Sequence, residues 1–155
     1  MTAGVEYFDG QAWKAMSSIM PLATTRNLDS GVFLTVTTYR DTNPLIMVGQ
    51  HPKFCLNASY SRNFVVVAMT VSGNHREVLD SEIRGAEVVR GRPRGGTMTN
   101  LLEQNRIPFM VKPVSDHVVE ITPTQPLPAG QYIIYSTGQG FYPGGYDFGV
   151  APGLD

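Results

Sequence analysis

Short runs of β-forming residues follow one another along this 155-residue chain, and turn residues separate them. The runs are rich in Val, Ile, Thr, Phe and Tyr, which favour strands. Phe64 to Val71 is apolar at nearly every position, so it predicts a central strand that is covered on both faces. Gly31 to Arg40 alternates instead. We expect Val32, Leu34 and Val36 to face the core, because successive strand residues point to opposite faces.

Turn signals join several of these runs into hairpins. Asp9-Gly10 is typical of a two-residue hairpin turn in which both residues take positive φ. This turn would place Trp13, on the second strand, where its ring can close one end of the core. Ser115-Asp116 predicts another hairpin. About ten short strands result, at the spacing expected of a β-sandwich or barrel.

Three segments break the strand pattern. Pro21 to Ser30 indicates a crossing loop. Glu82 to Gly96 is dominated by Arg, Gly and Pro, which predicts a long and partly mobile loop. Thr97 to Asn105 favours a helix of at most two turns. Thr99 would cap this helix, and the two leucines that follow would face the core.

The proline-rich stretch from Pro126 to Tyr132 is the strongest indication of a particular fold. Leu127 can fill the core while Pro128 to Gly130 turn the chain. Tyr132 then opens the next strand with its ring inward, so its hydroxyl can reach back to the backbone of the corner. This is the tyrosine corner of Greek-key sandwiches. The sequence thus predicts one all-β domain, residues 1–155, with an immunoglobulin-like Greek-key β-sandwich fold and at most one short helix.

The composition supports an all-β protein. Charged residues make up only 16% of the chain, against about 25% in an average domain, and the net charge is −1. Such a surface suits an all-β or extracellular protein and argues against a general polyanion binder. Cys55 is the only cysteine, so no disulfide can form within the chain, and its apolar neighbours predict a small buried residue. No apolar run approaches the roughly 20 residues of a membrane helix.

The sequence contains no strong catalytic or metal-binding motif. A Gly-x-Ser-x-Gly motif is absent, and neither Asp116-His117 nor His75 lies beside a nucleophile. The three histidines have no partners at metal-ligand spacing. Asp80 and Glu82 would share one face of a strand, where a solvated edge is more common than a pair of glycosidase carboxylates. We expect no catalytic residue, no metal and no cofactor, and a hydrolytic or carbohydrate-active site assembled by the fold is the alternative.

The sharpest local motif is basic. Arg90, Arg92 and Arg94 lie in Arg-Gly-Arg-Pro-Arg, which contains the core of the AT-hook. In that motif an extended Arg-Gly-Arg segment enters a narrow A·T-rich minor groove. AT-hooks usually sit in disordered and more basic tails, whereas this motif lies in a near-neutral domain. We therefore expect a solvated loop or a basic patch for a protein partner, and we rank nucleic acid below both.

A second candidate surface is aromatic. Phe141, Tyr142 and Tyr146 lie in a glycine-rich segment, residues 138–146. Exposed rings there could stack on a sugar or anchor a protein interface. The alternative is that Phe141 and Tyr142 fold back onto the sandwich. Unpaired sheet edges offer a further route to self-association, because a surface with few charges has few residues that block edge pairing.

Several motifs spread over most of the chain together carry a resemblance. They are Tyr7, Asp9-Gly10, Trp13, Phe64 to Val71, Arg76-Glu77-Val78, Ile107-Pro108-Phe109, Ile121-Thr122-Pro123, Pro126 to Tyr132 and Tyr146 to Val150. In combination they resemble a group of uncharacterised bacterial proteins that are typically small, exported and rich in β-structure. The corner is also similar to the Leu-x-Pro-Gly-x-Tyr corner of bacterial immunoglobulin-like modules. The resemblance implies a β-sandwich and export, and it implies no activity.

These patterns favour a non-enzymatic binding or structural module that is secreted, periplasmic or attached to the cell surface. We expect its partner to be another protein, a second copy of the chain through a sheet edge, or a glycan. The start of the sequence has no basic region followed by an apolar one, so either a signal has been removed or the protein is cytoplasmic. A small hydrolase or carbohydrate-active enzyme is the first alternative function, and a DNA-contacting protein is the second.

Overall fold

The computed structural model describes residues 4–57, 64–136 and 144–153, and nearly all regular structure in them is β-strand. The described residues form fifteen strands and one short helix, α2. The predicted all-β class is therefore confirmed, and one short helix occurs among the described residues. The elements in chain order are β1 (Val5–Phe8), β2 (Trp13–Ala15), β3 (Ala23–Asp29), β4 (Val32–Tyr39), β5 (Met47–Val48), β6 (Phe54–Asn57), β7 (Phe64–Ser72), β8 (His75–Arg84), β9 (Glu87–Val89), β10 (Arg92–Arg94), β11 (Thr97–Asn100), α2 (Leu101–Gln104), β12 (Phe109–Ser115), β13 (Val118–Pro123), β14 (Gly130–Ser136) and β15 (Tyr146–Val150).

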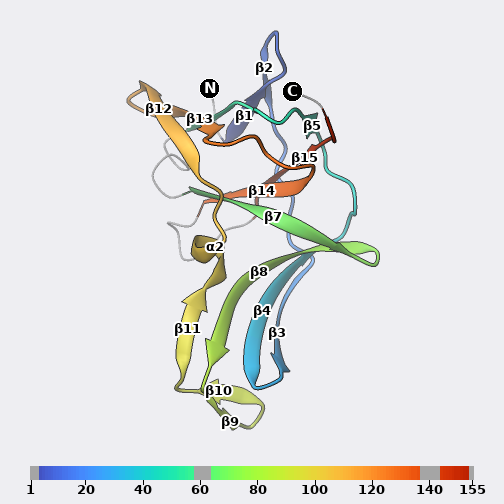
Figure 1. Ribbon diagram of the computed structural model, residues 1–155, viewed down its shortest axis with the longest axis vertical. Coiled ribbons are helices and arrows are strands. Elements are labelled where there is room, and N and C mark those ends of the chain that lie inside the picture. Colours follow the sequence, from blue (N-terminus) through green and yellow to red (C-terminus); the bar gives the residue numbers. More distant parts are fainter. Residues whose placement is uncertain (1–3, 58–63, 137–143, 154–155) are drawn as a thin grey trace.

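Two sheets and one separate hairpin contain all of these strands. The five-stranded sheet has the order β12-β13-β6-β1-β2. The eight-stranded sheet has the order β3-β4-β8-β7-β14-β15-β5, and β11 also pairs with β8. Half of the larger sheet lies against the smaller one, whereas β3, β4, β8 and β11 extend away, with the β9–β10 hairpin at the far tip (Figure 1). We call these four strands and the hairpin the arm, and the remaining strands the packed end.

The main core of the packed end lies between the two sheets. The five-stranded sheet contributes Val5, Phe54, Leu56 and Ile121, and β7, β14 and β15 contribute residues such as Phe148. The Phe148 ring contacts the ring of Phe54, with 4.8 Å between centroids. Burial of these large apolar side chains is the main force that holds the sheets face to face.

The central strand β7 is buried on both faces over residues 64–67, as its apolar run predicts, but the predicted run ends at Val71, which is 50% exposed. Phe64 and Val66 belong to the core between the sheets. Val65, Val67 and Met69 point the other way, into a second core cluster that also contains Tyr39 of β4, Val78 of β8 and Leu102 of α2. The base of the arm therefore shares a core with the packed end.

The tyrosine corner forms as predicted. The Tyr132 hydroxyl donates a hydrogen bond to the Pro128 carbonyl oxygen, 2.5 Å away, and burial raises the pKa of that hydroxyl. Leu127 is 2% exposed, and its backbone N–H donates to the Gln50 carbonyl. The corner thus ties the start of β14 to the segment between β5 and β6.

A buried ion pair lies where the arm meets the packed end. Arg76 of β8 and Asp147 of β15 are 2% and 0% exposed, and the Arg76 Nη1 to Asp147 Oδ2 distance is 2.7 Å. Arg76 also donates to the Gln131 side chain of β14 and to the Asp41 carbonyl, and Gln131 donates to the Thr42 carbonyl. These bonds join β8, β14, β15 and the segment after β4.

The structure corrects two predictions for the arm. Pro21 to Ser30 contains the strand β3, which pairs without interruption with β4. In β4 the predicted inward residues Val32, Leu34 and Val36 are only half-buried, whereas Phe33, Thr37 and Tyr39 are buried. Both faces of this strand carry β-forming residues, so alternation alone could not identify the buried face. In the structure, the rings of Phe33 and Tyr39 lie on the buried face.

The segment from Glu82 to Asn105 also differs from its prediction. Strand β8 continues to Arg84, and β9 and β10 form a hairpin in place of the predicted loop. The predicted helix is shortened to Leu101–Gln104, because Thr97–Asn100 pairs with β8 as β11. Asn100, not Thr99, caps the helix by accepting the Glu103 N–H. The two leucines are buried, as predicted.

The first hairpin turns differently from the expected two-residue loop. Phe8 pairs with Trp13, so residues 9–12 form the loop. The Asp9 carboxylate accepts the N–H groups of Gln11 and Ala12, which favours a longer Asx-type turn. The prediction for Trp13 is wrong, because its side chain is 38% exposed and packs on Phe8 outside the core.

Candidate functional site

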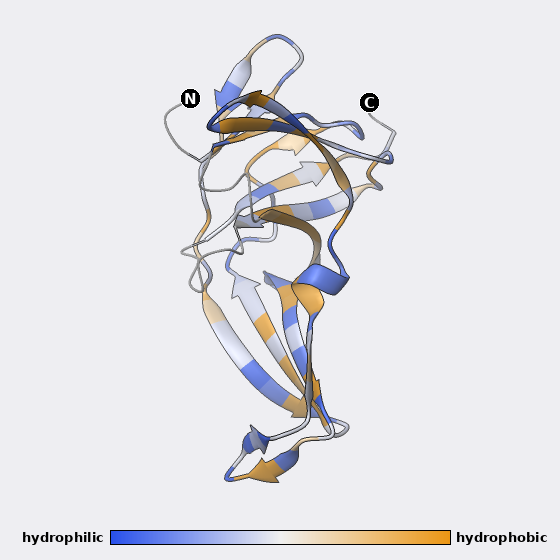
Figure 2. Cartoon of the chain, turned by 90° about the vertical axis from the view of Figure 1, so that its left-hand side faces the viewer, coloured by the Kyte–Doolittle hydropathy of each residue, from blue (hydrophilic) through white to orange (hydrophobic). Residues whose placement is uncertain are grey.

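The arm is far more exposed than the packed end. All seven residues of β3 are exposed, and the arm extends away from the packed end (Figure 2). One row of apolar side chains crosses the four strands, namely Leu28, Phe33, Ile83 and Met98. Phe33 is buried within this row, whereas Leu28 is 50% and Met98 66% exposed. Apart from Phe33, the outer half of the arm buries few large apolar side chains, so its stability rests largely on strand pairing.

The edge of β3 differs from the other described sheet edges. Open edges are normally protected by shortness, charge, proline or a bulge. β2, β5 and β11 have three, two and four residues, and β12 carries Lys112, Pro113 and a register shift. β3 has seven residues, no proline and an unbroken register with β4. Its protection is therefore limited to the charges of Arg26 and Asp29.

The β3–β4 turn shows which backbone groups this edge presents. Ser30 and Gly31 form a two-residue turn with φ of 53° and 82°, the pattern of a type I′ turn. Asp29 and Val32 flank that turn as a hydrogen-bonded pair. Counting back along β3 from Asp29, every second residue therefore points its N–H and C=O groups toward β4. The N–H groups of Thr24, Arg26 and Leu28 therefore point outward. Sequence reasoning missed this edge, although the adjacent Thr24 and Thr25 favour a strand.

The predicted basic residues lie together at the tip of the arm. Arg90 is in the β9–β10 turn, and Arg92 and Arg94 are on β10. All three are exposed. The motif is therefore folded as a hairpin and does not form the extended segment that an AT-hook requires.

The predicted aromatic surface is described only in part. Phe141 and Tyr142 lie outside the described residues. Tyr146, at the start of β15, is half-buried and packs against the main core. Its hydroxyl lies against Gly4, where an added Cβ would clash. The described end of this segment therefore supports the core.

The carboxylates of β8 do not form a catalytic pair. The ladder with β4 shifts register at Asp80, which places Asp80 beside Thr37 and leaves Glu82 on the opposite face. The predicted shared face is therefore wrong, because Asp80 is itself the extra residue of a bulge. Glu82 pairs with Arg84, and Asp80 Oδ2 accepts a 2.5 Å hydrogen bond from Thr37. Burial raises the pKa of Asp80, whereas the Thr37 bond lowers it.

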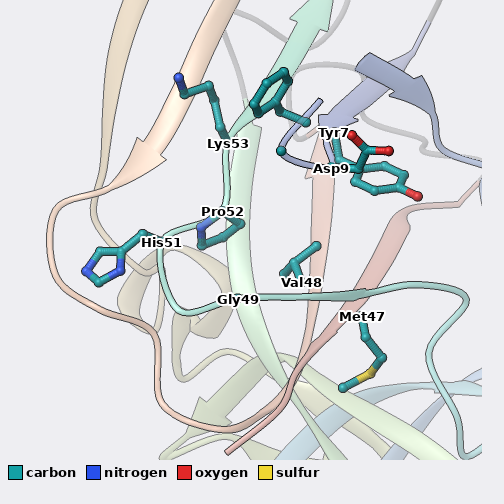
Figure 3. Close-up of a pocket in the computed structure, with 10 residues that line it drawn as sticks. Tyr7, Asp9, Met47, Val48, Gly49, His51, Pro52 and Lys53 are labelled. Atoms are coloured by element: carbon teal, nitrogen blue, oxygen red, sulfur yellow. The ribbon is translucent and has the colours of Figure 1, made fainter. Parts of the chain in front are cut away.

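The packed end has an open pocket of about 480 Å³ between the first hairpin and the β5–β6 segment. Asp9, His51 and Lys53 are its ionisable lining residues, together with Tyr7. Figure 3 shows the His51 ring directed away from Asp9 and Tyr7. The Asp9 carboxylate is held by Lys14 at 2.9 Å and by two backbone N–H groups, all of which lower its pKa. The pocket therefore does not align a base with a nucleophile.

The remaining chemically active side chains have structural surroundings. Cys55 is buried, as predicted, and burial raises the pKa of its thiol. His75 pairs with Glu77 at 2.8 Å, on the same strand. Among the described residues, no three of His, Cys, Asp and Glu gather closely enough to hold a metal ion. The described part of the chain also contains no helix long and apolar enough to cross a membrane.

Comparisons with protein-family models, with curated proteins and with solved structures return no match. The functional argument therefore rests on the geometry of the chain itself, in which the arm is the most unusual feature.

Proposed function

We propose that this protein is a non-enzymatic structural module that assembles with further copies of itself through the open edge of β3. The observation that carries the proposal is the contrast between this edge and the others. β3 is long, regular, free of proline and exposed at every residue. Such an edge is a template for pairing with another chain.

Pairing would supply what the arm lacks. A neighbouring strand would satisfy the outward N–H groups of Thr24, Arg26 and Leu28 and would bring the exposed Leu28 against another apolar side chain. An antiparallel arrangement with Arg26 directly opposite its own copy is disfavoured by like charge. A register shifted from that position avoids the repulsion and keeps the hydrogen bonds.

A concentration series tests the proposal. The parent should form dimers or larger species in light scattering as its concentration rises. Arg26→Pro removes one outward N–H from the middle of the edge without removing a bond to β4, so it should shift assembly to at least tenfold higher concentration. Arg26→Ala is the matched control, because it removes the same charge and keeps the N–H, and it should assemble like the parent.

A second variant covers the case in which the proline disrupts the arm. Thr24→Lys/Leu28→Lys adds charge to the edge and should also weaken assembly while circular dichroism stays unchanged. A parent that is monomeric at every concentration, or edge variants that assemble as the parent does, would contradict the proposal.

The same proposal includes the detailed fold of the packed end and the cellular compartment of the protein. The tyrosine corner supports an immunoglobulin-like Greek-key sandwich for the packed end. The low share of charged residues supports export. An experimental structure that traces the connections between all strands tests the first point, and fractionation of cells that express the gene from its natural start tests the second.

A further inference from the structure

The hairpin at the tip of the arm concentrates positive charge. Residues 87–94 contain one glutamate and three arginines, a net charge of +2, whereas the whole chain carries −1. Arg92 and Arg94 are two residues apart on β10, so their side chains share one face of the hairpin. Glu87 is directly opposite Arg94, and none of the ion pairs among the described residues joins them. The tip is thus a basic ribbon on a molecule that is otherwise slightly acidic.

The arginines of the tip differ from four others in the described structure and share with Arg40 the lack of a bond to the protein. Arg26, Arg76, Arg84 and Arg106 each donate to a side chain or carbonyl of the protein. The structure shows no such bond for Arg90, Arg92 or Arg94, and all three are exposed. Their guanidinium groups are therefore available to an external anion, for which the planar fork is well suited.

The backbone at Arg90 gives an independent indication. Arg90 has a φ of 52°, and apart from Ser30 it is the one non-glycine residue with positive φ among those described. Arg90-Gly91 forms the same type of turn as Ser30-Gly31. Asn, Asp and Gly adopt this conformation more readily than Arg. An arginine in this strained position is better explained by its side chain than by the turn.

In place of the order expected from the sequence, which ranked nucleic acid below a protein partner, we propose that the β9–β10 hairpin binds duplex nucleic acid, with the three arginines on backbone phosphates. The hairpin is a projecting two-stranded ribbon at the end of the arm (Figure 1), so it fits a concave anionic surface. The major groove of B-DNA is such a surface and admits a two-stranded β-ribbon. The minor groove is about half as wide, and the turn at Arg90-Gly91 prevents the extended entry of an AT-hook. This inference does not depend on assembly through β3.

Fluorescence anisotropy with a labelled 20-base-pair duplex tests the inference. Three phosphate contacts predict that binding weakens about 40-fold between 50 mM and 200 mM salt. Arg92→Ala/Arg94→Ala should reduce that change to about fourfold and weaken binding at 50 mM salt at least tenfold. Arg26→Ala/Arg84→Ala is the matched control, because it removes the same charge from the same arm, and it should bind nearly as the parent does.

The variant Arg90→Asn distinguishes the contribution of the turn conformation to binding from that of the arginine side chain. Asn adopts positive φ readily, so the hairpin should form at least as well while one phosphate contact is lost. Nuclear magnetic resonance shifts of β9 and β10 would establish that the hairpin is intact. Binding should then weaken and become less sensitive to salt.

Four outcomes would overturn the inference. The first is no binding to the duplex at 50 mM salt. The second is equal loss in the tip and control variants, which would indicate a general charge effect. The third is tighter binding to polyglutamate than to the duplex, which would identify an acidic protein as the partner. The fourth is displacement of a minor-groove dye, which would place the motif in the other groove.

Discussion

The packed end and the arm are built from similar strands and are stabilised in different ways. In the packed end, the first half of β7 is covered on both faces, and the Tyr135, Ile133 and Phe148 side chains are completely buried. In the arm, β3 is exposed along its whole length, and apolar residues such as Met98 face solvent. The comparison shows that strand propensity and hydrogen-bonded pairing can extend a sheet beyond its core, but only burial makes it stable in isolation.

The junction determines how the two regions depend on each other. Strand β8 pairs with β4 in the arm and with β7 in the packed end. Arg76, near its start, is bonded to Asp147 and Gln131 of the packed end. We therefore expect the base of the arm to unfold together with the packed end and its outer half to open more easily.

The largest effect is expected at this junction. Arg76→Ala leaves the buried Asp147 carboxylate without its cation, so the free energy of unfolding should fall by about 3–5 kcal/mol. Urea denaturation measures the change. The double variant Arg76→Met/Asp147→Leu removes both charges and should be closer to the parent than the single variant is. A single variant within about 0.5 kcal/mol of the parent would show that the pair does not connect the regions.

Two leucine truncations compare the regions directly. Leu127→Ala opens a cavity beneath the tyrosine corner and should cost about 2–5 kcal/mol. Leu28→Ala removes a side chain that is 50% exposed on the arm and should cost less than about 1 kcal/mol in the monomer. Denaturant titrations at low protein concentration measure both changes. If the two variants lost the same free energy of unfolding, the distinction between a packed and an exposed region would be contradicted.

The smallest expected effect concerns how the stability of the arm depends on pH. Burial raises the pKa of Asp80 above 3.8, so the folded state binds this proton more tightly than the unfolded chain does. The resulting stabilisation is present below pH 3.8 and is lost as pH rises through the higher folded pKa. Asp80→Asn should therefore flatten the pH dependence of amide exchange in β4 and β8 over this acidic range. An unchanged profile would show that Asp80 does not contribute.

The sequence predicted the parts of the fold that depend on local or wholly apolar signals. Phe64 to Val71 and the corner from Leu127 to Tyr132 are unambiguous because burial leaves them few alternatives. The charged and Gly-rich segment at residues 87–94 was predicted as a loop, and this was wrong. It forms two paired strands, because strand pairing there needs only a suitable turn and a partner strand.

The candidate site was predicted in part. The arginines are visible in the sequence, but their ribbon geometry depends on the turn at Arg90-Gly91. The open edge of β3 could not be predicted, because a sequence does not state which strand lacks a neighbour. Likewise, the separation of Asp80 from Glu82 arises from a bulge that one strand alone does not reveal.

Amide hydrogen exchange along β3 tests the central claim most directly. At low protein concentration, the inward N–H groups of Thr25 and Asn27 should be protected and the outward groups of Thr24, Arg26 and Leu28 should exchange rapidly. If β3 pairs with another copy, the three outward groups should become protected as the concentration rises, while the inward groups change little. Rapid exchange of the outward groups at every concentration, in a sample whose inward groups stay protected, would contradict assembly through this edge.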